Sequence, residues 1–191
     1  MSTVALPTMR MTTEEMFALP ENGTDRELIE GELRENPVTT RNRRHGRSTI
    51  RIGHLLEDWL ENQPEPRGEI VGGEAGFRLK RNPDTTVGID VAYVSAEVAA
   101  KTPGDARVFD GPPVLAVEIL SPSDTHERVT EKVTLYREAS VAEIWVVDPK
   151  LRTVLVLLAG QPPVLFNETQ ELTGGPELPG FRAAVAEFFR I

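Results

Sequence analysis

The segment VLAVEIL, residues 114–120, constrains the fold of this chain more than any other stretch. Side chains alternate between two faces along a strand, and both faces of this one are apolar apart from a single acid. Such a strand lies in the middle of a sheet, with both of its faces covered. Glu118 then places a carboxylate in or beside the core, where an unpaired charge is costly. We therefore expect a cation or a metal ion next to Glu118.

A second strand pattern, VGIDVAYVS at residues 87–95, repeats this feature, because Asp90 lies between Ile89 and Val91. If the two strands are neighbours, the carboxylates of Asp90 and Glu118 converge on one divalent ion. Oxygen ligands without His or Cys favour Mg²⁺ or Mn²⁺ over zinc. The alternative is that each acid pairs with an arginine and that no metal is bound.

The segment after the Glu118 strand predicts a helix, with Ser123 or Asp124 as its N-cap. Lys132 falls within the apolar stripe of this helix rather than on its polar face. A lysine in that position either extends to solvent or turns inward. Because the four residues SPSD separate the strand from the helix, the helix is expected to pack back across the sheet, and Lys132 can then reach the carboxylates.

Two acids that hold a divalent metal, with a lysine beside them, suit phosphodiester hydrolysis. The metal lowers the pKa of a bound water and neutralises charge on the phosphate. The lysine orients the nucleophile or stabilises the charge of the transition state.

The segment RNRRHGRSTIR, residues 41–51, holds five arginines and one histidine and no acid. The net charge of −9 repels nucleic acid on average, but a local basic patch still contacts phosphates. The candidate DNA contacts in this patch are Arg41, Arg43, Arg44 and Arg47. From the sequence pattern alone, His45 is a histidine that contacts phosphate or is merely exposed. The alternative for the whole segment is a solvated helix N-terminus or arm.

The composition excludes several classes of protein. The chain has no cysteine, which excludes disulfides, zinc–thiolate sites and a thiol nucleophile. The apolar runs are too short to span a membrane, and the N-terminus lacks the pattern of a signal peptide. We therefore expect a cytoplasmic protein without a membrane partner. Its 191 residues suit one domain, which we place at 12–191 after a disordered lead at 1–11.

The order of the predicted elements indicates a mixed α/β domain with one central sheet. A short helix has Thr12 or Thr13 as its N-cap, and two short strands flank Gly31. The remaining predicted elements are a helix at 48–62, one or two strands within 68–85, a loop at 101–113, a strand at 143–149, two later strands, and an amphipathic helix at 177–191.

The segments GIDVAYVS, PPVLAVEILSPSDTHERVTEKVTLYREASVAEIWVVDP and ELPGF, in this order, resemble the Uma2 family of restriction-endonuclease-like proteins, within the PD-(D/E)XK nuclease superfamily. The resemblance runs from about residue 12 to 189. It implies an α/β (α+β) fold, with a restriction-endonuclease-like αβββαβ core and a central mixed sheet flanked by helices. It also implies a Mg²⁺- or Mn²⁺-dependent endonuclease that cuts DNA. A homodimer is expected by analogy, because such nucleases must cut two strands.

The resemblance assigns Asp90 and Glu118 as metal ligands. The superfamily lysine is expected two residues after the glutamate, where this chain has Leu120. In similar proteins that lysine lies on the following helix, which makes Lys132 the catalytic lysine here. Similar proteins also often have an active-site histidine near the position of His45, so the resemblance makes His45 a candidate for that role.

The glutamate of the family's first motif is assigned to Glu32, with Glu74 and Glu57 as alternatives. The proline that usually precedes the aspartate is Ile89 in this chain. This departure favours a second hypothesis, a catalytically inactive nuclease-fold module that binds nucleic acid or a protein partner.

Overall fold

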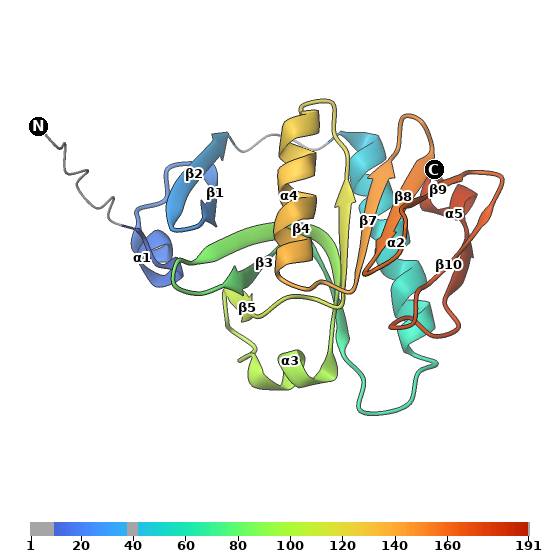
Figure 1. Ribbon diagram of the computed structural model, residues 1–191, viewed down its shortest axis with the longest axis horizontal. Helices are drawn as coiled ribbons and strands as arrows, with labels where there is room; N and C mark the ends of the chain where they lie inside the picture. Colours follow the sequence, from blue (N-terminus) through green and yellow to red (C-terminus); the bar gives the residue numbers. More distant parts are fainter. Residues whose placement is uncertain (1–9, 38–41, 191) are drawn as a thin grey trace, which may run out of the picture.

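The computed structural model describes residues 10–37 and 42–190, and it is built on one large mixed sheet (Figure 1). The main path of this sheet runs in the order β2-β1-β4-β6-β7-β8-β9. Its strands are β1 (Thr24–Ile29), β2 (Glu32–Pro37), β4 (Thr85–Val94), β6 (Leu115–Ile119), β7 (Glu143–Asp148), β8 (Thr153–Leu158) and β9 (Val164–Asn167). Off this path, β3 (Glu69–Lys80) pairs with β4 and with β5 (Val108–Asp110).

The sheet is mixed because a helical crossover joins two parallel strands in its middle, and because β5 pairs with β3 in parallel off the main path. Strands β6 and β7 are parallel, and α4 (His126–Glu138) connects them. Strand β6 is antiparallel to β4, and β7 is antiparallel to β8. The apolar segment at 114–120 therefore forms an inner strand, as its two apolar faces predict.

The two longest helices cover opposite faces of the sheet. Leu115 and Val117 of β6 pack in one core cluster with α2 (Arg43–Leu60). Ala116, between them, packs in a second cluster with Tyr136 of α4. Because side chains alternate along a strand, Glu118 lies on the face that α4 covers.

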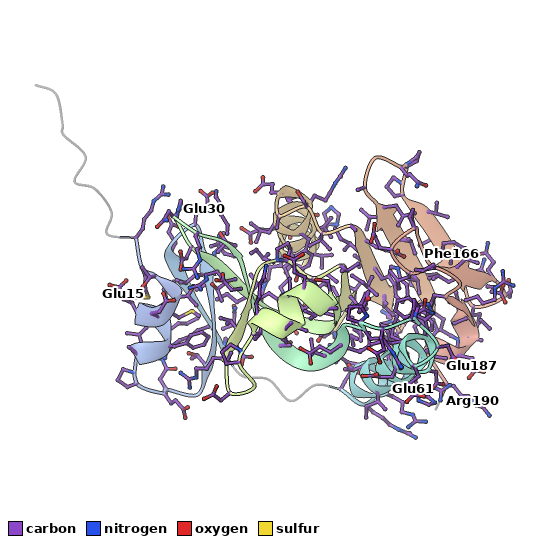
Figure 2. All side chains as sticks on the ribbon, turned by 90° about the horizontal axis from the view of Figure 1, so that it is seen from below. Glu15, Glu30, Glu61, Phe166, Glu187 and Arg190 are labelled. Atoms are coloured by element: carbon purple, nitrogen blue, oxygen red, sulfur yellow. The ribbon has the colours of Figure 1, made fainter. Side chains whose placement is uncertain are left out.

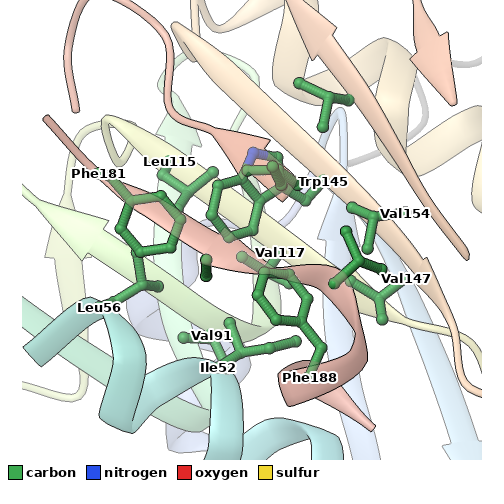
Figure 3. Close-up of a cluster of buried hydrophobic side chains, with 14 of the residues drawn as sticks. Ile52, Leu56, Val91, Leu115, Val117, Trp145, Val147, Val154, Phe181 and Phe188 are labelled. Atoms are coloured by element: carbon green, nitrogen blue, oxygen red, sulfur yellow. The ribbon is translucent and has the colours of Figure 1, made fainter. Parts of the chain in front are cut away.

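Figure 3 shows the larger core cluster, where the C-terminal segment closes over the sheet. Ile52 and Leu56 of α2 are fully buried beside Trp145 of β7. The ring of Phe188 stacks on Trp145 with 5.7 Å between ring centroids. Burial of each such side chain contributes about 1.5–3 kcal/mol to stability, which fixes α2 on the sheet.

Both helices that flank the acidic strands start at residues other than those expected. Helix α2 begins at Arg43 rather than near residue 48, because the Asn42 side chain accepts hydrogen bonds from the backbone N–H groups of Arg44 and His45. Helix α4 begins at His126 with Thr125 as its N-cap. Asp124 is not the cap, because its side chain accepts from the backbone N–H of Ser121 within the turn.

The ends of the domain also differ from the prediction. The C-terminal segment forms a strand, β11 (Arg182–Ala184), paired with β10 (Glu171–Thr173), and a single helical turn, α5 (Val185–Phe188), in place of one longer helix. The expected loop at 101–113 contains the end of α3 (Ala96–Lys101) and strand β5. Helix α1 (Thr13–Ala18) is capped by Thr12, as predicted.

Of the predicted disordered lead, residues 1–9 lie outside the described residues. Within the described residues, no helix combines the length and the apolar character that a membrane span requires.

Candidate active site

A cavity of about 460 Å³ opens on the face of the sheet that α4 covers. Its walls come from α1, β1, β2, β3, β4, β6 and α4, and His45 of α2 reaches it from the start of that helix. Asp90, Glu118 and Lys132 all line this cavity. The two predicted metal ligands and the predicted catalytic lysine therefore share one site.

Asp90 and Glu118 come together where the pairing of β4 with β6 ends. The last pair of this antiparallel ladder is Val91 with Val117, so Asp90 and Glu118 are the next residues along the two strands. Oδ2 of Asp90 accepts a hydrogen bond of 2.7 Å from the backbone N–H of Ile119. The Asp90 side chain thus continues the ladder and holds its carboxylate against β6.

His45 binds the other oxygen of Asp90. Its Nε2 atom lies 3.1 Å from Oδ1 of Asp90, and the two side chains are only 5% and 7% exposed. The Asn42 cap fixes the first turn of α2, which carries His45 into the cavity. The alternative that His45 is merely exposed is therefore wrong.

Lys132 turns inward from α4 and binds Glu118. Its Nζ atom lies 3.2 and 3.1 Å from Oε1 and Oε2 of Glu118, and it donates to the carbonyl oxygen of Gly88 at 2.9 Å. The hydroxyl of Tyr136, one helical turn further along α4, donates to Oε1 of Glu118. The carboxylate of Glu118 is therefore held by two residues of one helix.

The charges in this cavity change the proton affinity of their neighbours. Burial raises the pKa of Glu118 to about 7, and the charges of Asp90 and Glu74 act in the same direction against Lys132. Burial opposes the charge of Lys132, but the carboxylates of Glu118, Glu27 and Glu74 raise its pKa above the ordinary value. The cavity thus holds several carboxylates and one inward lysine, an arrangement that favours binding of a further cation.

Glu74 reaches this cavity through an irregularity of β3. The register of β3 on β4 shifts between Gly72 and Ala75, and Gly73 and Glu74 have φ angles of 77° and 63°. A positive φ is uncommon for a residue other than glycine, and a bulge redirects a side chain. A Cβ atom at Gly88 would lie 2.8 Å from Oε2 of Glu74, so the glycine leaves room for this carboxylate.

The chain matches one family model over most of its length. The model of the Uma2 family, described as "Putative restriction endonuclease", matches residues 13–186. The chain belongs to the Uma2 family. No curated protein sequence matches this Uma2 chain.

The fold of the Uma2 chain is also found in a solved structure. It is similar to the crystal structure of "a putative nuclease belonging to DUF820" from Anabaena variabilis ATCC 29413. The identity is 20%, the match covers 94% of this chain and 97% of that chain, and the TM-score is 0.76. The predicted restriction-endonuclease-like fold, a mixed sheet flanked by helices, is therefore confirmed.

The three glutamates considered for the first motif of the Uma2 pattern differ in whether they line the cavity. Glu32 is exposed on β2 and lies outside the cavity lining, and Glu57 is exposed on α2. Glu74 lines the cavity, and so does Glu27 of β1, which lies 3.7 Å from Lys132. Sequence reasoning missed Glu27, because an acid in a short, half-exposed strand gives no distinctive pattern. The glycine pair that precedes Glu74 within a strand is a signal that could have favoured it over Glu32.

The described arginines of the basic segment at the start of α2 do not line the cavity, although His45 of the same segment does. Arg41 lies outside the described residues, while Arg43 and Arg44 are exposed. Arg47 donates to the backbone carbonyl of Arg190 at 3.3 Å, so it faces the C-terminal segment. Figure 2 labels Arg190 near the end of the chain, beside Glu187. The proposed DNA contacts of these arginines stay predictions.

The carboxylate oxygens in the cavity are ligands of the kind that a hard divalent cation prefers. The protein supplies only part of the coordination shell of such an ion. Across residues 10–37 and 42–190, no group of three or more His, Asp or Glu side chains is arranged to hold a metal ion. Asp90 and Glu118 nevertheless present carboxylate oxygens from adjacent strands, in a cavity that carries excess negative charge. Mg²⁺ is commonly bound by one or two carboxylates while it keeps several waters.

Proposed function

We propose that this Uma2 protein is a Mg²⁺- or Mn²⁺-dependent endonuclease that hydrolyses phosphodiester bonds of DNA. The observation that carries the proposal is the convergence of Asp90, Glu118 and Lys132, from β4, β6 and α4, on one cavity. Membership of a family described as "Putative restriction endonuclease" supports the same reaction. The predicted homodimer and cytoplasmic location remain predictions.

Asp90 and Glu118 would hold the metal. When bound, it would supply a water of lowered pKa and positive charge opposite the phosphate. The protein contributes the placement of these ligands. The Ile119 N–H and His45 fix Asp90, and Tyr136 fixes Glu118. Hydrogen bonds of this kind orient the ligand carboxylates before a cation binds.

Lys132 contributes a fixed positive charge beside the same carboxylates. Its ammonium group carries three donor hydrogens, and its pKa is raised, so it stays charged at neutral pH. A charge held in a partly buried site stabilises the negative charge that develops on a phosphate during hydrolysis. In this role Lys132 orients the attacking oxygen or stabilises the transition state.

A second candidate function is a catalytically inactive module that binds nucleic acid or a protein. The observation that favours it is the closed arrangement of Glu118, whose two oxygens already accept from Lys132 and Tyr136. The ion pair of Glu118 with Lys132 can stabilise the fold without any role in catalysis. A binding module of this kind has no need of a tight divalent site.

Cleavage of supercoiled plasmid separates the two candidates. The purified protein with Mg²⁺ or Mn²⁺ is expected to yield nicked and linear DNA, and EDTA is expected to stop the reaction. Asp90→Asn should lower the rate at least about a hundredfold, as loss of a catalytic group does. Asp105→Asn is the matched control, since Asp105 is exposed and lies outside the cavity lining. Absence of cleavage with every metal, or equal cleavage by Asp90→Asn, would contradict the nuclease proposal.

A further inference from the structure

The cavity is lined by cations as well as by carboxylates. Its cationic lining residues within the described chain are Arg26, Arg107, Arg128 and Lys132. A substrate with a phosphate backbone needs at least one such group free to bind an anion, because the carboxylates repel phosphate. The contacts of these four residues show which of them is free.

Three of the four are already bound to other groups of the protein. Arg26 binds Glu35 at 3.0 Å and donates to two backbone carbonyls. Arg107 lies over the ring of Phe17 at 4.9 Å and donates to the carbonyl of the same residue. Lys132 donates to Glu118 and to a backbone carbonyl of β4. Each of these cations would have to give up a contact to bind a phosphate.

Arg128 is in a different position. It is exposed on the first turns of α4, and its guanidinium makes no hydrogen bond or ion pair with any other described residue. It precedes Lys132 by four residues, so the two side chains lie on the same face of the helix about one turn of 5.4 Å apart. Arg128 therefore offers a free cation beside the group that binds Glu118.

We propose that Arg128 binds a backbone phosphate of the nucleic acid, next to the phosphate that faces Asp90 and Glu118. The inference rests on the proposed function, and it adds the residue that positions the substrate strand along α4. A guanidinium is suited to this task, because its planar array of donors binds two phosphate oxygens at once. The contact fixes register and does not read base sequence.

The same helix supplies a matched control. Arg137 is also exposed on α4 and lies outside the cavity lining. It follows Arg128 by nine residues, which at about 100° per residue places it on the opposite face of the helix. Arg128→Gln and Arg137→Gln therefore change the net charge of the protein and of the helix equally. Only Arg128→Gln removes a cation that lines the cavity.

The test measures binding of the full chain to a fluorescein-labelled DNA duplex by fluorescence anisotropy. The titration contains Ca²⁺ in place of Mg²⁺ and is repeated over a range of salt concentrations. Arg128→Gln is expected to weaken binding about tenfold at low salt and to reduce the salt slope by about one, while Arg137→Gln leaves both near the wild-type values. Arg128→Lys should recover the slope but only part of the affinity, because it keeps the charge and loses the bidentate geometry. With plasmid and Mg²⁺, Arg128→Gln should raise KM and leave kcat nearly unchanged.

The outcomes separate this inference from the proposed function. If the wild type binds and cuts DNA while Arg128→Gln behaves like Arg137→Gln, the role of Arg128 is wrong and the nuclease proposal stands. If the wild type neither binds nor cuts DNA, the proposed function fails and the inference fails with it. A loss of kcat without a change in KM would also contradict the inference, since it would place Arg128 in the chemical step.

Discussion

The Nζ atom of Lys132 lies 3.1 Å from Oε2 of Glu118, and their side chains are only 22% and 13% exposed. This ion pair joins α4 to the middle strand of the sheet that precedes it in the chain. The ion pair offsets the free-energy cost of placing a carboxylate in an apolar strand, because Glu118 and Lys132 neutralise each other. It also holds both groups at the cavity where Asp90 lies.

Removal of Lys132 alone is expected to destabilise the protein strongly. Lys132→Met leaves Glu118 without its cation, which costs about 3–5 kcal/mol for a buried pair. The double variant Glu118→Gln with Lys132→Met should recover much of that loss, because no unpaired charge remains. Urea unfolding of the wild type, both single variants and the double variant gives the coupling energy. Additive effects of the two substitutions would show that the ion pair does not stabilise the fold.

His45 is expected to act through Asp90. His45→Ala removes the group 3.1 Å from Oδ1 of Asp90 and leaves a buried carboxylate oxygen without that partner. The expected loss of stability is about 1–3 kcal/mol. Mn²⁺ affinity, measured by titration calorimetry, should fall with it, because Asp90 is less firmly held. His54→Ala is the control, since His54 is exposed on the same helix. Equal Mn²⁺ affinity in the two variants would remove His45 from the site.

Gly88 provides a test of the position of Glu74. In Gly88→Ala the new methyl group would meet Oε2 of Glu74 at 2.8 Å, so the flexible carboxylate must move. Stability should change by less than about 1 kcal/mol, while Mn²⁺ affinity falls about tenfold if Glu74 supports the ligands. Gly104→Ala is the control, because nothing lies within 4 Å of a Cβ atom there. An unchanged affinity in Gly88→Ala would show that Glu74 has no part in metal binding.

Asp110 is expected to stabilise the fold while its carboxylate is ionised and to lose this effect in acid. Arg78 and Arg81 lower its pKa from 3.8 to about 2. A carboxyl group whose pKa is lower in the folded state stabilises the protein above its unfolded pKa, and this contribution disappears between about pH 4 and pH 2. Because the Asp110 side chain is 53% exposed, the contribution is about 1 kcal/mol or less.

Urea unfolding of Asp110→Asn and wild type at several pH values measures this effect. The difference in unfolding free energy between them should be constant near neutral pH and shrink as the pH falls below 4. A difference that grows on acidification would have the wrong sign for a lowered pKa and would contradict the assignment.

The sequence predicted the parts of the site that follow from periodicity. The apolar alternation around Glu118 and Asp90 indicated inner strands, and the short SPSD turn indicated a helix packed back on the sheet, so the approach of Lys132 could be foreseen. These features depend on local patterns of burial, which a single sequence carries.

The remaining site residues depend on contacts between distant segments. His45 reaches Asp90 because Asn42 starts α2 several residues before its apolar pattern begins. Glu74 reaches the cavity through a bulge that the glycines allow but do not require. Glu32 was chosen on resemblance to a motif, whereas the hairpin register places it opposite Ile29, at the turn end of the hairpin. Bulges, caps and hairpin register are set by the whole fold and cannot be derived from periodicity.

The central claim is that Asp90 and Glu118 hold a divalent metal. A crystal of the full chain soaked in Mn²⁺, with diffraction data collected at the manganese absorption edge, tests it most directly. An anomalous peak is expected within coordination distance of one oxygen of Asp90 and one of Glu118, and it should be lost in Asp90→Asn. A map at saturating Mn²⁺ with no peak between these carboxylates, and with Lys132 still bound to Glu118, would contradict it.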